Sequence, residues 1–215
     1  MTELVMHGIA YPVTSLGPGR RVVLWTAGCS RRCPGCITPE LLTSDGSRRV
    51  PVELVAEKIL AISMPLEGIT FSGGDPADQP MALAALLRTL RIARPMWNVL
   101  LYTGYTLEQL RADGTARADL LDLADVIIDG PYMRNIAPAH PLAGSGNQRL
   151  HARTPEGIAM LGRMSNSGPA FNLGLNRNGD GMLIGVSDSM TRRKVHDVLT
   201  LHRSTASGQP ASSNH

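Results

Sequence analysis

Residues 22–36 read Val-Val-Leu-Trp-Thr-Ala-Gly-Cys-Ser-Arg-Arg-Cys-Pro-Gly-Cys. The first six of them, residues 22–27, form an apolar run with the length of a short buried strand. The run stops at a glycine, and Cys29, Cys33 and Cys36 follow. The sequence here predicts a buried strand that delivers a loop of three cysteines.

Three further stretches repeat the pattern of a short apolar strand that ends in a polar or glycine-containing turn. The expected strands are residues 68–71, 99–102 and 125–130, and the turns are residues 72–76, 103–105 and 129–132. Apolar residues at helical spacing predict helices that start at Pro51, cover residues 79–93 and follow a cap at Thr106. Strands that alternate with helices indicate an α/β fold with a parallel sheet, so all four turns are expected at one edge.

The pattern changes after residue 130. Residues 137–148 are rich in Pro, Gly and Ala and predict a long loop, while residues 171–175 and 182–186 flank Asn178-Gly179 as in a β-hairpin. Residues 189–203 look helical and basic. We expect a core over residues 1–152, a small hairpin and helix extension over 153–203, and a disordered tail over 204–215.

Composition narrows the classes of function. The 215 residues include 43% hydrophobic, 18% charged and 4% aromatic residues, with a net charge of +3. So few aromatic residues offer little to stack on bases, and the basic pairs fit a solvated face, so we expect no nucleic-acid partner. No apolar run is long enough to span a membrane and the N-terminus does not resemble a signal peptide. We therefore expect a cytoplasmic protein without membrane contact.

The cysteine loop has the spacing C-x3-C-x2-C and contains all three cysteines of the chain. Thiolates bind zinc or iron–sulfur clusters, and a packed odd number of cysteines does not suit a disulfide framework. Three thiolates on a 4Fe–4S cluster leave one iron without a protein ligand, which is typical of a site that binds substrate. The alternative is a zinc site in which His140 or His151 supplies the fourth ligand.

A second motif, Ser72-Gly73-Gly74-Asp75-Pro76, follows the next predicted strand. Two glycines permit a close approach of the backbone to a ligand, and the carboxylate of Asp75 can accept hydrogen bonds from an ammonium or hydroxyl group. Alone, this motif would indicate only a turn. It gains meaning because the parallel sheet is expected to bring it beside the cysteine loop.

Together these motifs resemble the radical S-adenosylmethionine (SAM) superfamily, and most closely its anaerobic ribonucleoside-triphosphate reductase activating enzymes. The resembling stretches keep the family order and cover roughly residues 9–152: residues 17–19, 28–36, 69–76, 102–110, 125–130 and 144–149. The resemblance implies a partial parallel β/α barrel whose rim carries a 4Fe–4S cluster and SAM. One departure is Ile37-Thr38, where the family often has Tyr-Asn after the third cysteine.

Roles for individual residues follow from the resemblance. Cys29, Cys33 and Cys36 would ligate the cluster, and Gly35, Cys36 and Ile37 would lie against the adenine or ribose of SAM. The residues that would receive the methionine amino group are Ser72, Gly73, Gly74 and Asp75. The residues that could meet the methionine carboxylate are Asn147 and Arg149. No side chain is singled out as a catalytic acid or base.

The resemblance also implies the reaction, in which SAM is cleaved reductively to methionine and a 5′-deoxyadenosyl radical. In the favoured interpretation the radical abstracts hydrogen from a glycine on an anaerobic ribonucleotide reductase-like partner, with an electron donor such as flavodoxin or ferredoxin. One alternative directs the radical to a peptide or small metabolite. Another is a non-catalytic iron–sulfur protein that senses or carries electrons.

Overall fold

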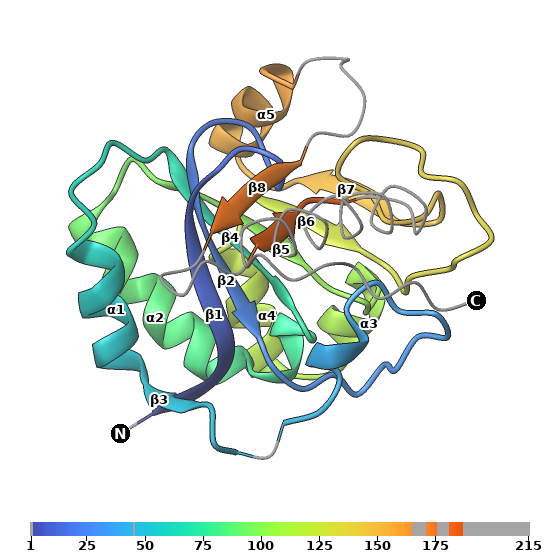
Figure 1. The fold of residues 1–215 in the computed structure, drawn as a ribbon, viewed down its shortest axis with the longest axis horizontal. Helices are drawn as coiled ribbons and strands as arrows, with labels where there is room; N and C mark the ends of the chain where they lie inside the picture. Colours follow the sequence, from blue (N-terminus) through green and yellow to red (C-terminus); the bar gives the residue numbers. More distant parts are fainter. Residues whose placement is uncertain (1, 45, 165–170, 176–180, 187–215) are drawn as a thin grey trace, which may run out of the picture.

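A seven-stranded sheet forms the centre of the molecule (Figure 1). The computed structural model describes residues 2–44, 46–164, 171–175 and 181–186. In sheet order the strands are β3 (Arg49–Pro51), β1 (Glu3–Val13), β2 (Arg21–Thr26), β4 (Gly68–Gly73), β5 (Asn98–Tyr102), β6 (Val126–Asp129) and β7 (Arg149–Ala152). β2, β4, β5 and β6 run parallel, whereas β1 and β7 pair antiparallel with them.

The helices between the parallel strands cover one face of the sheet. They are α1 (Val52–Leu60), α2 (Pro80–Ala93), α3 (Leu107–Ala112) and α4 (Thr115–Asp122). Two short 3-10 turns, η1 (Pro39–Leu41) and η2 (Pro76–Asp78), follow β2 and β4. Figure 1 shows α1, α2 and α4 side by side behind the strands. Their apolar stripes meet alternate strand residues, such as Leu24 and Phe71, in the largest buried cluster. Burial of these side chains supplies the main driving force for this layer.

The opposite face of the sheet is concave and carries the other set of alternate side chains. Val23 of β2 packs there against Val13, Leu16 and Ile184. Leu100 packs there with Met160 of α5 (Pro155–Gly162) and with residues of β6. This face is also covered by the hairpin of β8 (Asn172–Leu175) and β9 (Gly181–Ile184), whose arrows lie in front of the sheet in Figure 1.

The predicted fold is confirmed. Each expected strand and helix up to residue 130 has a counterpart, and Thr106 caps α3 in a capping box with Gln109. The hairpin over residues 171–186 is also present. The sequence did not predict β1, the edge strands β3 and β7, or the helices α4 and α5. The helix expected over residues 189–203 and the tail over 204–215 lie outside the described residues.

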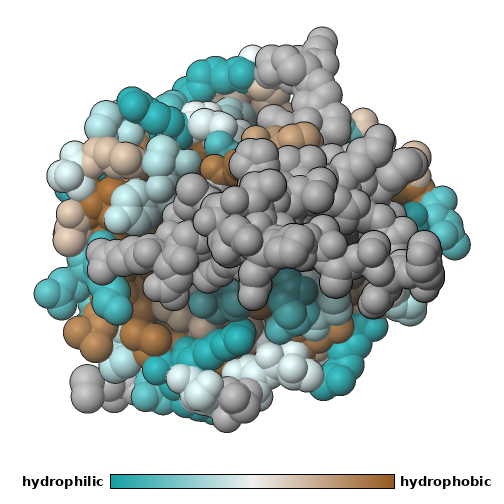
Figure 2. Space-filling model, in the orientation of Figure 1, coloured by the Kyte–Doolittle hydropathy of each residue, from teal (hydrophilic) through white to brown (hydrophobic). Residues whose placement is uncertain are grey.

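The partition at residue 152 stays a prediction, and the structure adds one observation to it. Met160 of α5 lies beyond that boundary, yet it is fully buried against β5 and β6. In the part of the chain that the structure describes, no helix is long and apolar enough to cross a membrane. On the face shown in Figure 2, hydrophilic and hydrophobic residues are interspersed over the coloured surface.

Candidate functional site

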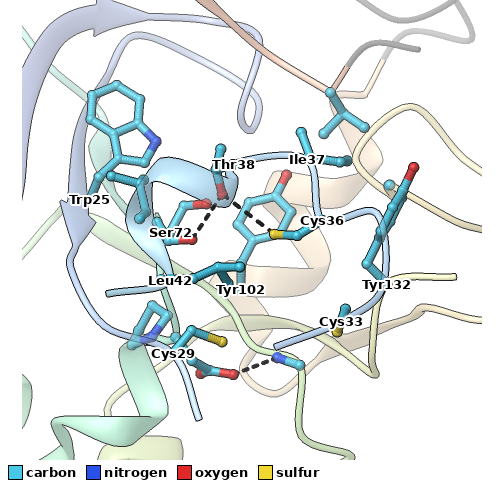
Figure 3. A pocket seen from close by; sticks show the side chains of 18 of the residues that line it. Trp25, Cys29, Cys33, Cys36, Ile37, Thr38, Leu42, Ser72, Tyr102 and Tyr132 are labelled. Atoms are coloured by element: carbon cyan, nitrogen blue, oxygen red, sulfur yellow. Dashed lines mark hydrogen bonds between the residues drawn. The ribbon is translucent and has the colours of Figure 1, made fainter. Parts of the chain in front are cut away.

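The four turns at the C-terminal ends of the parallel strands line one cavity of about 310 Å³. The cysteine loop, the Gly-Gly-Asp turn and the turn after β5 meet there with residues that follow β6. Figure 3 shows the side chains of Cys29, Cys33 and Cys36 around the same hollow as Ser72 and Tyr102. The cavity has the size of a small-molecule site, and its position is the one that a parallel sheet predicts.

Backbone hydrogen bonds fix the start of the cysteine loop and close a turn at its end. Gly28 leaves β2 with a φ of 92°, a conformation that favours glycine. Its N–H donates to the carbonyl of Leu41 at 2.9 Å, and the N–H of Cys29 donates to the carbonyl of Leu42 at 3.1 Å. Within the loop, the N–H of Cys36 donates to the carbonyl of Cys33 at 3.1 Å. The three thiols are therefore held on a tightly turned segment and not on a free loop.

The cysteine sulfurs have the surroundings of ligands. All three cysteines are free and half-buried. Burial raises the pKa of the Cys29 thiol, whereas hydrogen bonds from the backbone N–H groups of Arg32 and Arg31 act in the opposite direction. Backbone N–H groups that point at a sulfur stabilise its thiolate form, which is the form that binds metal. Hydrogen bonds of this kind also tune iron–sulfur clusters.

The Gly-Gly-Asp turn lies directly on the cysteine loop. The N–H of Gly74 donates to the carbonyl of Thr26, and the N–H of Asp75 donates to the carbonyl of Gly28, each at 2.9 Å. A Cβ on Gly73 would lie 2.4 Å from the Thr26 carbonyl oxygen, and a Cβ on Gly74 would lie 2.0 Å from that of Gly28. Only glycine fits at these two positions without displacing backbone.

Asp75 is buried and already has three hydrogen-bond donors. Its carboxylate accepts from the N–H of Ala77 at 3.0 Å, the hydroxyl of Thr103 at 2.9 Å and the N–H of Gly104 at 2.8 Å. Burial raises the pKa of Asp75 to about 6, although these hydrogen bonds act to lower it. In this structure Asp75 joins the turn after β4 to the turn after β5. Its contact with the methionine amino group stays a prediction.

Several residues of the cavity wall were missed by the sequence analysis. They are Trp25, Thr38, Leu42, Tyr102 and Tyr132, labelled in Figure 3, and Met182 to Val186 of the hairpin segment. The hydroxyl of Tyr102 is buried and has no hydrogen-bond partner among the described residues. The period-two alternation of β2 and β5 would have pointed to Trp25 and Tyr102, since both stand at the ends of strands that face the concave side.

Ile37 and Gly35 lie beside a second cavity of about 940 Å³. This second cavity is lined by residues 134–141 of the long loop, and it shares Cys36, Ile37 and Tyr132 with the first. Gly35 has a φ of 71°, and a Cβ there would approach the side chain of Arg134 at 3.1 Å. Of the residues predicted to contact the adenine or ribose, Cys36 and Ile37 line both cavities and Gly35 lines the second one.

Asn147 and Arg149 are not brought to the cavity by the structure. The amide of Asn147 donates to the carbonyl of Pro131 at 2.7 Å. The guanidinium of Arg149 donates to the carboxylates of Asp129 and Glu108, at distances from 2.5 to 3.1 Å. The neighbouring Gln148 lines the cavity instead. The contact predicted for these two residues with the methionine carboxylate is untested.

Comparison with known proteins decides the family. Residues 15–151 match the model of the 4Fe–4S single cluster domain, and the three cysteines all lie within the match. The chain belongs to the radical SAM family. Membership of this family implies a resident 4Fe–4S cluster and SAM as its co-substrate.

Curated relatives within the radical SAM family are named anaerobic ribonucleoside-triphosphate reductase-activating proteins. The relative in Salmonella typhimurium is 32% identical over 66% of this chain and 94% of its own length. That in Vibrio cholerae is 33% identical over 67% of this chain and 96% of its own. That in Enterobacteria phage T4 is 31% identical, over 64% and 87% respectively. These relatives match about two thirds of this chain and most of their own length.

The residues present fit the cluster that this radical SAM family carries. Three half-buried thiols line one cavity, and backbone N–H groups face the sulfur of Cys29. Three thiolates would leave one iron of a 4Fe–4S cluster without a protein ligand. Ser72 and the backbone of the two glycines line the same cavity, where a small polar ligand can approach them.

The two histidines considered for a zinc site are placed elsewhere. His151 belongs to the edge strand β7, and its Nε2 lies 3.2 Å from the Asp129 carboxylate. His140 lines the second cavity, and its Nδ1 accepts a hydrogen bond from the N–H of Leu142 at 3.2 Å. Within the described residues, no group of three His, Cys, Asp or Glu side chains is arranged to hold a single metal ion.

A network that the sequence did not predict supports the start of the cysteine loop. The hydroxyl of Tyr105 lies 2.7 Å from the hydroxyl of Ser30 and 2.7 Å from the carboxylate of Asp78. That carboxylate also accepts from the N–H of Ser30 at 2.7 Å. The guanidinium groups of Arg31 and Arg117 lie over the ring of Tyr105, at 4.9 and 4.4 Å from its centre. Ser30, the residue after Cys29, is therefore held by hydrogen bonds to both Asp78 and Tyr105.

Proposed function

We propose that this protein cleaves SAM reductively and installs a glycyl radical on a partner that resembles the anaerobic ribonucleoside-triphosphate reductase. The observation that carries the proposal is the meeting of the three cysteines and the Gly-Gly-Asp turn in one cavity. The names of the relatives support the choice of partner. Flavodoxin or ferredoxin is the proposed class of electron donor.

The bound cluster would supply one electron at low potential to SAM. Cys29, Cys33 and Cys36 would hold it and leave its open side toward the cavity. The glycines at 73 and 74 keep the wall of the cavity at backbone level, so the polar end of SAM has room beside the cysteine loop. Asp75 keeps that wall in place by joining the turns after β4 and β5.

The proposed reaction consumes one electron from an external donor. SAM and the electron give methionine and a 5′-deoxyadenosyl radical as one C–S bond breaks. That radical takes a hydrogen atom from a glycine Cα of the partner, which leaves 5′-deoxyadenosine and a glycyl radical. Neither step needs a proton transfer, so the reaction needs no general acid or base.

Two features favour a second candidate, a radical SAM enzyme that acts on a peptide or small metabolite. The cavity wall includes Ile37 where the activating enzymes often have Tyr, and it also includes the hairpin beyond the family match. Loops and added segments around a shared core commonly set the choice of substrate. In that case the first half of the step is kept and the hydrogen donor differs.

The test is to mix the anaerobically reduced protein, SAM and a co-encoded reductase. The expected result is a stable glycyl-radical doublet in the EPR spectrum of the large subunit, absent with Cys36→Ala. If 5′-deoxyadenosine forms but no protein radical appears, the second candidate replaces the first. If a cluster is present and SAM neither perturbs its spectrum nor is cleaved, the protein is an electron carrier or sensor.

A further inference from the structure

The β8–β9 hairpin lies outside the part of the chain that defines the family. The family match ends at residue 151, and β8 begins at Asn172. The relatives in Salmonella typhimurium and Vibrio cholerae already match over 94% and 96% of their own length. They have little length left for a counterpart. The hairpin is therefore an addition to the core.

Polar contacts attach the hairpin to the connection between β1 and β2. The side-chain oxygen of Asn172 accepts hydrogen bonds from the N–H groups of Thr14 and Ser15, both at 2.9 Å. The hydroxyl of Ser15 is buried and donates to the carbonyl of Ile184 at 2.8 Å. Asn172 and Ile184 are directly opposite each other in the hairpin register. Both strands are thus fixed to the same segment of the core.

Apolar packing gives the hairpin an inner and an outer face. Ile184 is only 5% exposed and packs on Val13, Leu16 and Val23 of the concave face. Leu173 is 59% exposed, as expected for its place on the opposite side of the hairpin. The hairpin thus has the two faces of a docked layer and not those of a loose appendage.

The docked hairpin reaches the cysteine cavity. Residues Met182 to Val186 line this cavity together with Cys29, Cys33 and Cys36. Val186 lines the second cavity as well, on the far side of Ile37. A segment from beyond the family core therefore forms one wall of the site that the core builds.

We propose that the β8–β9 hairpin is a working part of the site, a wall that screens the cysteine cavity from water on the concave side of the sheet. Ile184 is its positioning residue, since its burial holds Met182 and Val186 at the cavity. Exclusion of water protects reactive species and strengthens polar interactions inside a site. The link to radical chemistry rests on the proposed function, but the screening itself does not.

The experiment compares Ile184→Asp with Leu173→Asp in the holoenzyme with its cluster reconstituted. The first places a carboxylate in the buried interface and opens the hairpin, while the second adds the same charge to the outer face. We expect Ile184→Asp to lose iron to the anionic chelator bathophenanthroline disulfonate about tenfold faster than the wild type. A change of this size is expected when one buried polar group lowers the free energy of a local opening. Leu173→Asp should stay within about twofold of the wild type, because it changes only an exposed position.

Two further measurements separate screening from general damage. Ile184→Val keeps an apolar side chain in the interface and should lose iron as slowly as the wild type. Asn172→Ala removes only the polar attachment and should lose iron at an intermediate rate. It takes the place of Ile184→Asp if that variant does not fold. The affinity for SAM should weaken with iron loss across the series, at a temperature where every variant is folded by circular dichroism. Equal rates of iron loss in all variants would overturn the proposal. None of these arms needs a partner, so a failure to activate a reductase leaves their result intact.

Discussion

A Cβ on Gly74 would lie 2.0 Å from the carbonyl oxygen of Gly28, the residue that precedes the first cysteine. The two loops that build the site are therefore in contact through backbone atoms, without a side chain between them. Since Asp75 also donates its N–H to the same carbonyl, a change at Gly74 cannot be confined to the Gly-Gly-Asp turn. The cysteine loop has to move with it.

Gly74→Ala should therefore weaken both halves of the site. We expect a loss of about 1–3 kcal/mol in the free energy of unfolding, the usual cost of forcing an extra carbon into a packed position. The iron content after reconstitution should fall together with SAM binding. Gly162→Ala is the matched control, since a Cβ there meets nothing within 4 Å. Normal iron content in Gly74→Ala would show that the two loops are not coupled.

The three thiols should carry one cluster. Anaerobic reconstitution is expected to give brown protein with about four irons and four sulfides per chain, as three thiolates on one cubane require. Replacing Cys29, Cys33 or Cys36 by Ala should abolish the brown colour in each case, while Met96→Ala, at a 90% exposed position, should not. Colourless wild-type protein with one zinc and no iron would contradict the assignment.

The sequence predicted the parallel core and its cysteine rim because both follow from local patterns. Short apolar runs that end in glycine or polar turns decide where the strands lie, and parallel pairing then brings the turns together. β1 escaped prediction because its alternation is broken by bulges, one of them between Ala10 and Val13. β7 is a four-residue edge strand, Arg-Leu-His-Ala, too short and polar to show a pattern.

The side-chain networks of the site could not be predicted in the same way. Tyr105, Ser30 and Asp78 come from three separate segments, and only the folded chain brings their polar atoms within 2.7 Å. The same holds for Arg149, whose partners Glu108 and Asp129 belong to a helix and a neighbouring strand. Spacing in the sequence carries no information on such partners, because their distance depends on tertiary packing.

Tyr105→Phe tests whether the network behind the cysteine loop matters for the cluster. It removes the hydroxyl that Ser30 and Asp78 share and keeps the ring that contacts Arg31 and Arg117. We expect a loss of about 1 kcal/mol in unfolding free energy, the typical value of a side-chain hydrogen bond. Iron should also leave the holoenzyme faster than in wild type. Tyr11→Phe, at a 48% exposed tyrosine, serves as the control. Unchanged iron loss in Tyr105→Phe would limit the network to a role in folding.

Arg149 forms ion pairs with Asp129 and Glu108, so its replacement tests whether it stabilises the fold or binds SAM. Burial alone would raise the pKa of Asp129, but hydrogen bonds from Arg149 and from the N–H of Leu107 outweigh it, and the pKa lies below its ordinary value of 3.8. A carboxylate with a lowered pKa in the folded chain stabilises the fold above that value and loses this contribution as the pH falls. Acidification from about pH 5 to pH 3 should therefore destabilise the wild type through Asp129.

Arg149→Gln should remove part of this stabilisation without a specific loss of SAM binding. Asp129 is buried and would lose its cation, while Arg149 itself is half exposed, so we expect a cost of about 1–2 kcal/mol at pH 7. The variant should also lose less stability than the wild type on acidification, measured by urea unfolding at several pH values. Arg88→Gln, in the exposed pair with Asp119, should cost about 0.5 kcal/mol or less. If Arg149→Gln instead keeps its stability and weakens SAM binding about tenfold, the guanidinium belongs to the SAM carboxylate and leaves Asp129 when SAM binds.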